Sequence, residues 1–255
     1  MNYNKPQQDW RGKTVWVIGA SSGIGRATAS ALHARGAKVT VSARNTAALV
    51  QFEQEHPGSL GLPLDVGDRA AVERAAQTVW GRQPLDWMVY SAGHYQPQTA
   101  QTLNLDELLL HQQINYAGAL HVLAATVPHM LRQRTGHISL LGSVAGYRGL
   151  PNSLAYGPTK AAINHLAEIL YLDLHPAGVG VSLVCPGFVQ TQLTDKNHFA
   201  MPALISPEMA AQNILRGWAQ GAFEIHFPKR FTYSMKLLRL LPHWLAFALL
   251  RRIAI

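Results

Sequence analysis

Short apolar runs alternate with longer amphipathic stretches along most of the chain. The runs are continuously apolar, which is typical of parallel strands that helices cover on both faces. The alternation predicts an α/β fold in which helices flank a doubly wound parallel sheet of about seven strands. The expected strands are Thr14–Ile18, Lys38–Ser42, Leu60–Leu64, Trp87–Tyr90, Gly136–Leu141, Gly180–Cys185 and Glu224–Phe227.

Local signals mark the ends of two helices. Asn104 can act as an N-cap, and Glu107, three residues later, completes the pattern of a capping box. Ser206-Pro207-Glu208 combines a capping hydroxyl with a proline and an early acid, and Gly221 follows as a stop signal.

The composition fits one well-buried domain. Of the 255 residues, 48% are hydrophobic and 14% are charged, a balance that suits one α/β domain better than two small ones. No break appears between residues 10 and 230, so we expect a single domain over residues 1–230 and a C-terminal apolar and basic helical extension over residues 231–255. The one cysteine, Cys185, allows no intrachain disulfide and is interpreted as a core thiol. Residues 1–10 lack the apolar core of a signal peptide, so we expect a cytoplasmic protein.

A glycine-rich turn follows the first expected strand. The strand runs directly into Gly19-Ala-Ser-Ser-Gly23-Ile-Gly25, and a helical run from Arg26 to Arg35 begins immediately afterwards. Glycines let the backbone approach a ligand, and the free amides and dipole of a helix N-terminus favour an anion. Strand, turn and helix together predict a pyrophosphate cradle in a Rossmann-type βαβ unit.

A phenol and an ammonium group are spaced for proton transfer further along the chain. Tyr156 and Lys160 are four residues apart, which on a helix puts both side chains on one face. A free tyrosine ionises near pH ~10 and is a poor general acid/base at neutral pH. A lysine charge about 4.5 Å away stabilises a phenolate by about 3–4 kcal/mol. We therefore expect Lys160 to lower the pKa of Tyr156.

These motifs together resemble those of the classical short-chain dehydrogenase/reductases. The family's cofactor motif is Thr-Gly-x-x-x-Gly-x-Gly, and this chain has Ile18 in place of the threonine. It also has Ser91 where the family usually has an asparagine. The resemblance continues in order, from about residue 10 to about residue 195, through Leu64-Asp65-Val66, Ser91-Ala92-Gly93, Asn115, Ser143, Tyr156, Lys160, Pro186-Gly187 and Thr191.

The resemblance implies an oxidoreductase that interconverts a carbonyl and a secondary alcohol by hydride transfer. Tyr156 would exchange a proton with the substrate oxygen, and Lys160 would lower the phenol pKa and bind the nicotinamide ribose. Ser143 would hydrogen-bond and polarise the carbonyl. Asn115 would hold a water that links Lys160 to bulk solvent. These four residues are the expected catalytic set.

The residues after the second strand favour NADP(H) over NAD(H). Folds that prefer NAD place an acid about 20 residues beyond the glycines, whereas an arginine there accommodates a 2′-phosphate. No acid occurs between Thr40 and Val50, and Arg44 can bind a phosphate through its planar donors; alternatively, Arg44 is a solvated surface charge. By the resemblance, the other cofactor contacts are Gly19, Ser21, Ser22, Gly23, Ile24, Gly25, Asn45, Asp65, Val66, Ser91, Ala92, Gly93, Tyr156, Lys160, Pro186, Gly187, Val189 and Thr191.

A mobile substrate loop is expected from Gln192 to Ile205. We expect a hydrophobic carbonyl or alcohol substrate, either lipid-like or ring-containing, although apolar residues here also suit core packing. The histidines show no zinc-ligand motif, so no metal is expected. The apolar side chains are Phe199, Met201, Pro202 and Leu204 in the loop, with His94, Tyr95, Leu150 and Phe188 around the site.

The extension over residues 231–255 combines apolar and basic side chains. Its longest apolar run, Trp244 to Leu250, is too short to span a bilayer. An apolar face beside Lys236, Arg239, Arg251 and Arg252 suits an interfacial helix on anionic lipid, at the inner face of the membrane. Packing on a neighbouring subunit or over the substrate pocket is the second interpretation, and both stay open.

Charge and family resemblance bear on the remaining partners. The net charge of +8 fits a membrane surface and an anionic cofactor alike, and no nucleic-acid-binding module is recognisable. The resemblance implies a homodimer or homotetramer. Two non-catalytic alternatives are an NADP(H)-binding regulator and a membrane-surface scaffold on the same fold. Retention of both Tyr156 and Lys160 favours the enzyme.

Overall fold

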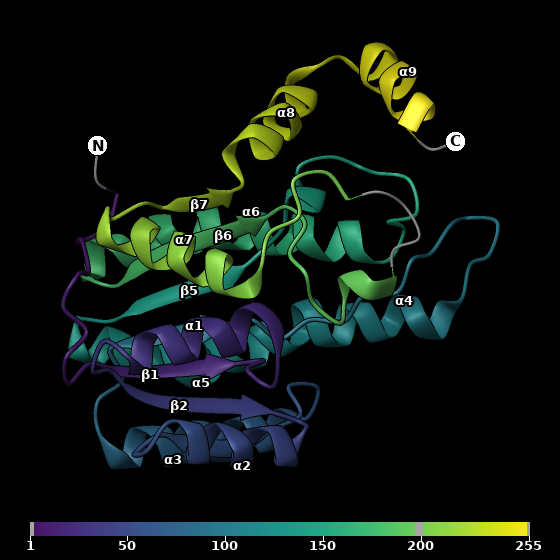
Figure 1. Cartoon of the computed structure of the whole chain (residues 1–255). Helices are drawn as coiled ribbons and strands as arrows, with labels where there is room; N and C mark the ends of the chain where they lie inside the picture. Colours follow the sequence, from purple (N-terminus) through teal and green to yellow (C-terminus); the bar gives the residue numbers. More distant parts are fainter. Residues whose placement is uncertain (1–2, 197–200, 254–255) are drawn as a thin grey trace.

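A sheet of seven parallel strands forms the centre of the molecule, in the order β3-β2-β1-β4-β5-β6-β7 (Figure 1). The computed structural model describes residues 3–196 and 201–253. It confirms the predicted doubly wound sheet, and the strand ends differ from the predicted ones by at most one residue. The strands are β1 (Thr14–Ile18), β2 (Lys38–Ala43), β3 (Leu60–Pro63), β4 (Trp87–Tyr90), β5 (His137–Leu141), β6 (Gly180–Pro186) and β7 (Glu224–Phe227).

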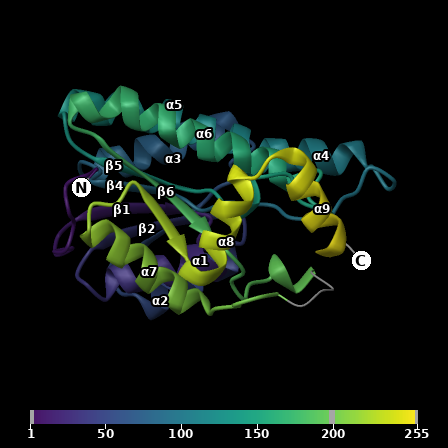
Figure 2. The ribbon, with the colours of Figure 1, turned by 90° about the horizontal axis from the view of Figure 1, so that it is seen from above.

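Helices cover both faces of the sheet. Seen from above, α5, α6 and α3 lie on one side of the strands, and α7, α1 and α2 lie on the other (Figure 2). A short π-helical segment, Gln112–Ala117, joins α4 to α5. The helices are α1 (Gly23–His33), α2 (Thr46–Glu55), α3 (Arg69–Arg82), α4 (Leu105–His111), α5 (Gly118–Gln133), α6 (Tyr156–Leu174), α7 (Pro207–Ala219), α8 (Lys229–Leu240) and α9 (His243–Ile253).

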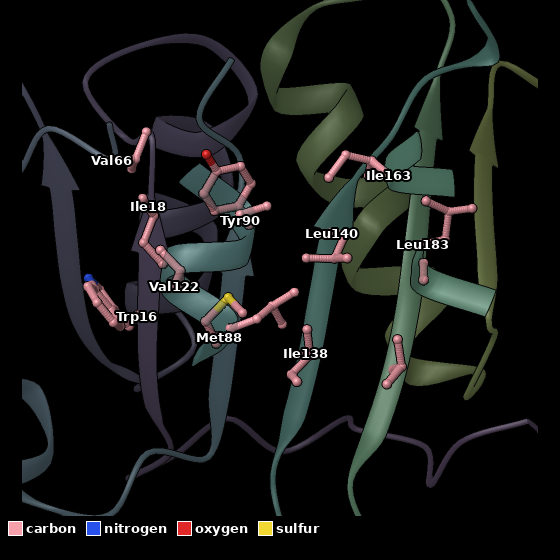
Figure 3. Packing of buried hydrophobic residues seen from close by; sticks show 14 of the residues in the cluster. Trp16, Ile18, Val66, Met88, Tyr90, Val122, Ile138, Leu140, Ile163 and Leu183 are labelled. Atoms are coloured by element: carbon pink, nitrogen blue, oxygen red, sulfur yellow. The ribbon is translucent and has the colours of Figure 1, made fainter. Parts of the chain in front are cut away.

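The sheet separates two hydrophobic cores. Successive residues of β1 point to opposite faces, so Trp16 and Ile18 join one core while Val15 and Val17 join the other. Figure 3 shows the first core, where Trp16 and Ile18 lie near Met88 of the neighbouring strand. All residues of β1 are buried. Each large apolar side chain buried in this way contributes roughly 1.5–3 kcal/mol, which explains why the strands are continuously apolar.

The predicted helix caps are present, but the capping box is not. The Asn104 side chain accepts a hydrogen bond from the Glu107 amide at 3.2 Å, and Ser206 caps α7 through the Met209 amide. The Glu107 carboxylate does not return to the amide of Asn104. It binds His94 Nε2 at 2.9 Å instead, because the loop after β4 brings that ring beside α4. The second half of the capping-box prediction is therefore wrong.

The N-terminal segment before β1 is tied to the opposite end of the chain. The Asn4 side chain donates to the Val181 carbonyl at 2.8 Å and accepts from the Val181 amide at 3.1 Å. The Asn4 amide donates to the Gly221 carbonyl at 2.9 Å. Trp10 is buried against Trp87 and Trp218. Residues 3–10 thus strap the first and last thirds of the chain together.

The C-terminal extension forms two helices, as predicted. Helix α8 begins at Lys229, so the expected boundary at residue 230 falls inside its first turn. Met235 of α8 joins the first hydrophobic core, and Ala246 and Leu250 of α9 are buried. Within the described residues, neither of these helices nor any other meets the length and apolar character that a membrane crossing requires.

Candidate active site

A cleft of about 410 Å³ opens where β1 and β4 end. The chain order reverses between these two strands, and parallel sheets bind ligands at such a switch point. Asn45 and Asn115 are the two predicted site residues that do not line the cleft. Those that do are Gly19, Ser21, Ser22, Gly23, Ile24, Gly25, Arg44, Asp65, Val66, Ser91, Ala92, Gly93, Ser143, Tyr156, Lys160, Pro186, Gly187, Val189 and Thr191.

The turn after β1 is packed so closely that only glycine fits at two positions. A Cβ on Gly19 would lie 2.3 Å from the Ala92 amide nitrogen, and Gly19 has a φ of +88°. A Cβ on Gly25 would lie 2.2 Å from the Gly19 carbonyl oxygen. These contacts bring the ends of β1 and β4 and the first turn of α1 together at the wall of the cleft.

The first turn of α1 fits the pyrophosphate of a dinucleotide. Ser22 is the N-cap residue, yet its side chain makes no capping hydrogen bond, and Ser22 itself lines the cleft. The amides of a helix's first turn have no partner within the helix and attract anions. The backbone around Gly23 can therefore hold a phosphate without any change in the turn.

Arg44 and Asn45, at the end of β2, have different surroundings. Arg44 is exposed at the cleft, and among residues 3–196 and 201–253 its guanidinium has no ion pair or hydrogen-bond partner. Asn45 caps α2 through a 3.1 Å hydrogen bond from the Ala48 amide. The carboxamide oxygen of Asn45 is thus used by the helix, whereas the Arg44 guanidinium, which lines the cleft, is available as a donor to a ligand.

Asp65 and Val66 follow β3, which is an edge strand of the sheet, and both line the cleft. Asp65 is exposed, and one of its carboxylate oxygens accepts from the Gly67 amide at 2.9 Å. Val66 is buried, and its carbonyl contacts the His121 ring at 2.9 Å. This turn fixes a carboxylate beside an apolar side chain at the cleft, an arrangement suited to an aromatic ring with an amino group.

Tyr156, Lys160 and Ser143 meet at the inner wall of the cleft. Tyr156 is the first residue of α6, and Lys160 follows one turn later. The Lys160 Nζ donates to the Leu141 carbonyl at 2.7 Å and lies 5.5 Å from the centre of the Tyr156 ring. Ser143 follows β5, and its hydroxyl accepts from the Ala145 amide at 3.1 Å. The predicted helical spacing is confirmed.

The predicted lowering of the Tyr156 pKa is wrong for this structure. Burial raises that pKa to about 12, and a hydrogen bond with Ser143 lowers it only in part. Burial also lowers the pKa of the Lys160 ammonium to about 8. Lys160 lies over the ring and points to a carbonyl, so its charge does not outweigh the loss of water around the phenol. At neutral pH, Tyr156 therefore holds its proton.

Asn115 braces the backbone beneath the cleft. It is fully buried in the π-helical segment, and its Nδ2 donates to the His94 carbonyl and to the Thr159 hydroxyl, both at 3.0 Å. Its Oδ1 accepts from the His94 amide at 2.6 Å. Both side-chain hydrogens are used by the protein, so the expected water bridge to Lys160 stays a prediction that these contacts do not support.

A cluster of His94, Glu107 and His111 lies beside the cleft, and the sequence analysis missed it. Their possible ligand atoms lie within 4.8 Å of one another. The two nitrogens of the buried His111 ring are already engaged, one with the Glu107 carbonyl at 2.6 Å and one with the Gln96 amide at 3.1 Å. The His94 hydrogen bond lowers the pKa of Glu107. The cluster joins the loop after β4 to α4, and the four-residue spacing of Glu107 and His111 was its only sequence signal.

The expected substrate loop closes one side of the cleft. Gln192, Leu193, Thr194 and Lys196 line it, and Lys196 Nζ donates to the Tyr95 carbonyl at 2.9 Å. The Tyr95 ring meets the Tyr156 ring edge-on at 5.1 Å. Phe199 lies outside the described residues.

Two buried groups near the site take no part in lining it. Cys185 is fully buried, as predicted for a core thiol, and burial raises its pKa to about 12. Tyr147 donates to the Glu224 carboxylate, which also accepts from Lys236 of α8 at 2.5 Å.

Comparison with known proteins identifies the family. The model of the short chain dehydrogenase family matches residues 13–201. An uncharacterized oxidoreductase of Myxococcus xanthus is 33% identical over 246 residues, which cover 94% of this chain and 97% of the relative. An uncharacterized oxidoreductase of Staphylococcus epidermidis is 33% identical over 206 residues, covering 79% of this chain and 87% of the relative.

Solved structures show the same architecture. A short-chain dehydrogenase from Streptomyces avermitilis has a TM-score of 0.79 at 25% identity, covering 89% of this chain and 92% of that chain. A short-chain dehydrogenase/reductase from Burkholderia phymatum, in complex with NAD, has a TM-score of 0.81 at 24% identity and shares the fold over 91% of this chain and 94% of that chain. Together with the matched residues and the cleft, these likenesses show that the chain belongs to the short-chain dehydrogenase family of oxidoreductases, which use a nicotinamide cofactor.

Proposed function

We propose that the protein reduces a hydrophobic carbonyl to a secondary alcohol with NADPH. The observation that carries the proposal is the placement of Tyr156, Lys160 and Ser143 on the wall of the cleft that also contains the Gly19–Gly25 turn and Arg44. A proton donor, a carbonyl-binding hydroxyl and a dinucleotide cradle thus face one space. A bound nicotinamide would supply the hydride there.

The three polar side chains have separate roles in the proposed reaction. Tyr156 holds a proton at its hydroxyl, and its raised pKa keeps that proton in place until a substrate oxygen accepts it. Ser143 donates a hydrogen bond that orients the same oxygen. The Lys160 charge, 5.5 Å from the centre of the phenol ring, stabilises the phenolate that remains. In the oxidative direction, Tyr156 takes the proton back.

Arg44 supports the preference for NADPH over NADH. A guanidinium that is exposed at the cleft and has no partner among the described residues is available to a 2′-phosphate. Arg44→Ala should raise the KM for NADPH at least tenfold and leave the KM for NADH nearly unchanged. Arg74→Ala, an exposed arginine on α3 away from the cleft, is the matched control. Equal effects of Arg44→Ala on both cofactors would contradict the assignment.

The test of the activity is NADPH oxidation against a panel of carbonyls from small ketones to long-chain and ring-containing compounds. Tyr156→Phe removes one oxygen and should abolish turnover while NADPH binding, followed by fluorescence, persists. Tight NADPH binding by the wild-type chain without turnover on any carbonyl would favour the regulator on the same fold. The aromatic ring of Tyr95, which meets the Tyr156 ring, and the ring of Phe188, which lies between the cleft residues Gly187 and Val189 in the chain, support an apolar substrate.

Exposed leucines and an isoleucine on α5 and α6 are available for contact between subunits. We propose a cytoplasmic enzyme that forms a homodimer or homotetramer. Helices α5 and α6 expose Leu120, Leu131, Ile169 and Leu172, the last at 70% of its surface, and a second copy would cover them. Light scattering of Leu172→Glu beside the wild-type chain tests this, since loss of the oligomer is the expected result.

A further inference from the structure

Helices α8 and α9 both expose large apolar side chains. Tyr233, Leu237 and Leu240 are spaced on one side of α8, and Leu240 is 80% exposed. On α9, Trp244 and Phe247 are exposed, Trp244 at 74% of its surface. We call these five side chains the tail face. A group of large apolar side chains that are this exposed to solvent indicates an interaction surface.

The tail face is held outward by contacts on the other side of the helices. Thr232 and Met235 of α8 and Ala246 and Leu250 of α9 are buried. Arg148, in the loop that follows Ser143, donates to the Leu241 carbonyl at 2.9 Å. The exposure of the tail face is therefore a property of the folded helices.

The charge around the tail face has one sign. Residues 225–255 contain six lysines and arginines and no aspartate or glutamate. Lys236 is paired with Glu224 at 2.5 Å, whereas Lys229, Arg230, Arg239, Arg251 and Arg252 are exposed. A second copy placed on this face would bring two sets of cations together, which is unfavourable. An anionic surface has the complementary charge.

We propose that the tail face docks on an anionic lipid bilayer, with its apolar side chains among the lipid chains and its arginines at the headgroups. Helix α9 has 11 residues, a length of about 16 Å at 1.5 Å per residue, so it lies in the interface and does not cross it. An exposed tryptophan beside arginines is the composition that interfacial helices use.

Docking brings the cleft close to the bilayer. Figures 1 and 2 place α8 and α9 at the end of the molecule to which the strands point. Phe231 in the first turn of α8 packs against Phe188 at 5.4 Å and would contact a Cβ on Gly187, which lines the cleft. An apolar carbonyl dissolved in the bilayer would have a short path to Tyr156; this consequence rests on the proposed function, whereas docking does not.

Co-sedimentation with vesicles tests the docking without any activity measurement. The full-length chain is mixed with vesicles of phosphatidylcholine, or of phosphatidylcholine and phosphatidylglycerol. We expect binding to the anionic vesicles and weak binding to the neutral ones. The Tyr156→Phe variant should bind as the wild-type chain does, so failure of the proposed catalysis would not affect the result.

Three charge variants, one apolar double variant and one control separate the contributions to docking. Removal of one arginine charge should lower binding to anionic vesicles roughly fivefold. The variants are Arg239→Gln, Arg251→Gln and Arg252→Gln. Leu240→Ser combined with Trp244→Ser should lower it at least tenfold, whereas Val50→Ser, at an exposed apolar residue of α2, should not. Thermal unfolding confirms that each variant is folded. Binding that none of these tail variants weakens, or no binding to anionic vesicles, would overturn the proposal. A third outcome would also overturn it: a wild-type chain that is a dimer, does not bind vesicles, and dissociates when Leu240→Ser and Trp244→Ser are combined.

Discussion

Replacing Gly19 with alanine should disrupt the cofactor turn through two separable effects. The first is backbone conformation, because Gly19 has a φ of +88°. The second is contact, because the new Cβ would lie 2.3 Å from the Ala92 nitrogen and 2.6 Å from the Ser91 carbonyl carbon. Both neighbours are backbone atoms at the end of β4, so they cannot move aside as a flexible side chain would.

The magnitude follows from these two effects. A left-handed conformation costs an alanine about 1–2 kcal/mol, and overpacking adds about 1–3 kcal/mol. We expect Gly19→Ala to lower the free energy of unfolding by about 2–5 kcal/mol. Gly12 and Gly58 have similar φ values of +71° and +85°, but a Cβ there would meet nothing within 4 Å. Gly12→Ala and Gly58→Ala should therefore show the conformational cost alone.

Urea unfolding and NADPH fluorescence measure the outcome. Gly19→Ala should have a clearly lower unfolding midpoint than either control, with an unchanged m value. It should also bind NADPH at least tenfold more weakly, because separating β1 from β4 moves the turn that holds the pyrophosphate. A Gly19→Ala protein no less stable than the Gly12→Ala and Gly58→Ala proteins would refute the close-packing argument.

Three further predictions concern charge and burial. Because burial lowers the Lys160 pKa to about 8, kcat/KM for carbonyl reduction should fall about tenfold per pH unit above that value; a profile flat to pH 10 would contradict it. Burial also lowers the pKa of His137 to about 3, so the unfolded chain binds the extra proton and stability should fall from pH ~6.5 towards pH 3 by up to about 5 kcal/mol. Urea titrations should show a smaller fall for His137→Gln. Asn4→Ala leaves the Val181 amide and carbonyl without partners and should cost about 2–4 kcal/mol in urea unfolding, whereas an unchanged midpoint would show that the N-terminal strap adds no stability.

The sheet and the position of the cleft could be predicted because their determinants are local. A buried parallel strand must be apolar throughout, as β1 is, and a tight turn into a helix requires glycine at Gly19 and Gly25. The four-residue spacing of Tyr156 and Lys160 also fixes their common helix face. Such features depend on a few neighbouring residues, so the sequence alone specifies them.

The surroundings of the site could not be predicted, because they depend on residues that are distant in the sequence. The proton affinity of Tyr156 follows from the burial of the whole wall and from the 2.7 Å hydrogen bond that directs Lys160 to Leu141. The carboxylate of Glu107 could bind its own helix or His94, and only the folded loop decides between them. The polar start of the chain gave no sign that Asn4 is buried beside Val181.

The strap formed by residues 3–10 has a consequence for synthesis on the ribosome. Asn4 is synthesised long before its partners, Val181 and Gly221, which lie 177 and 217 residues later in the chain. At about 5–20 residues per second, the segment waits on the order of 10 s or longer for them. During that interval Trp10 cannot reach Trp218. Residues 3–10 therefore complete their native contacts late, and Trp10 lacks one of its two tryptophan neighbours until Trp218 has been synthesised.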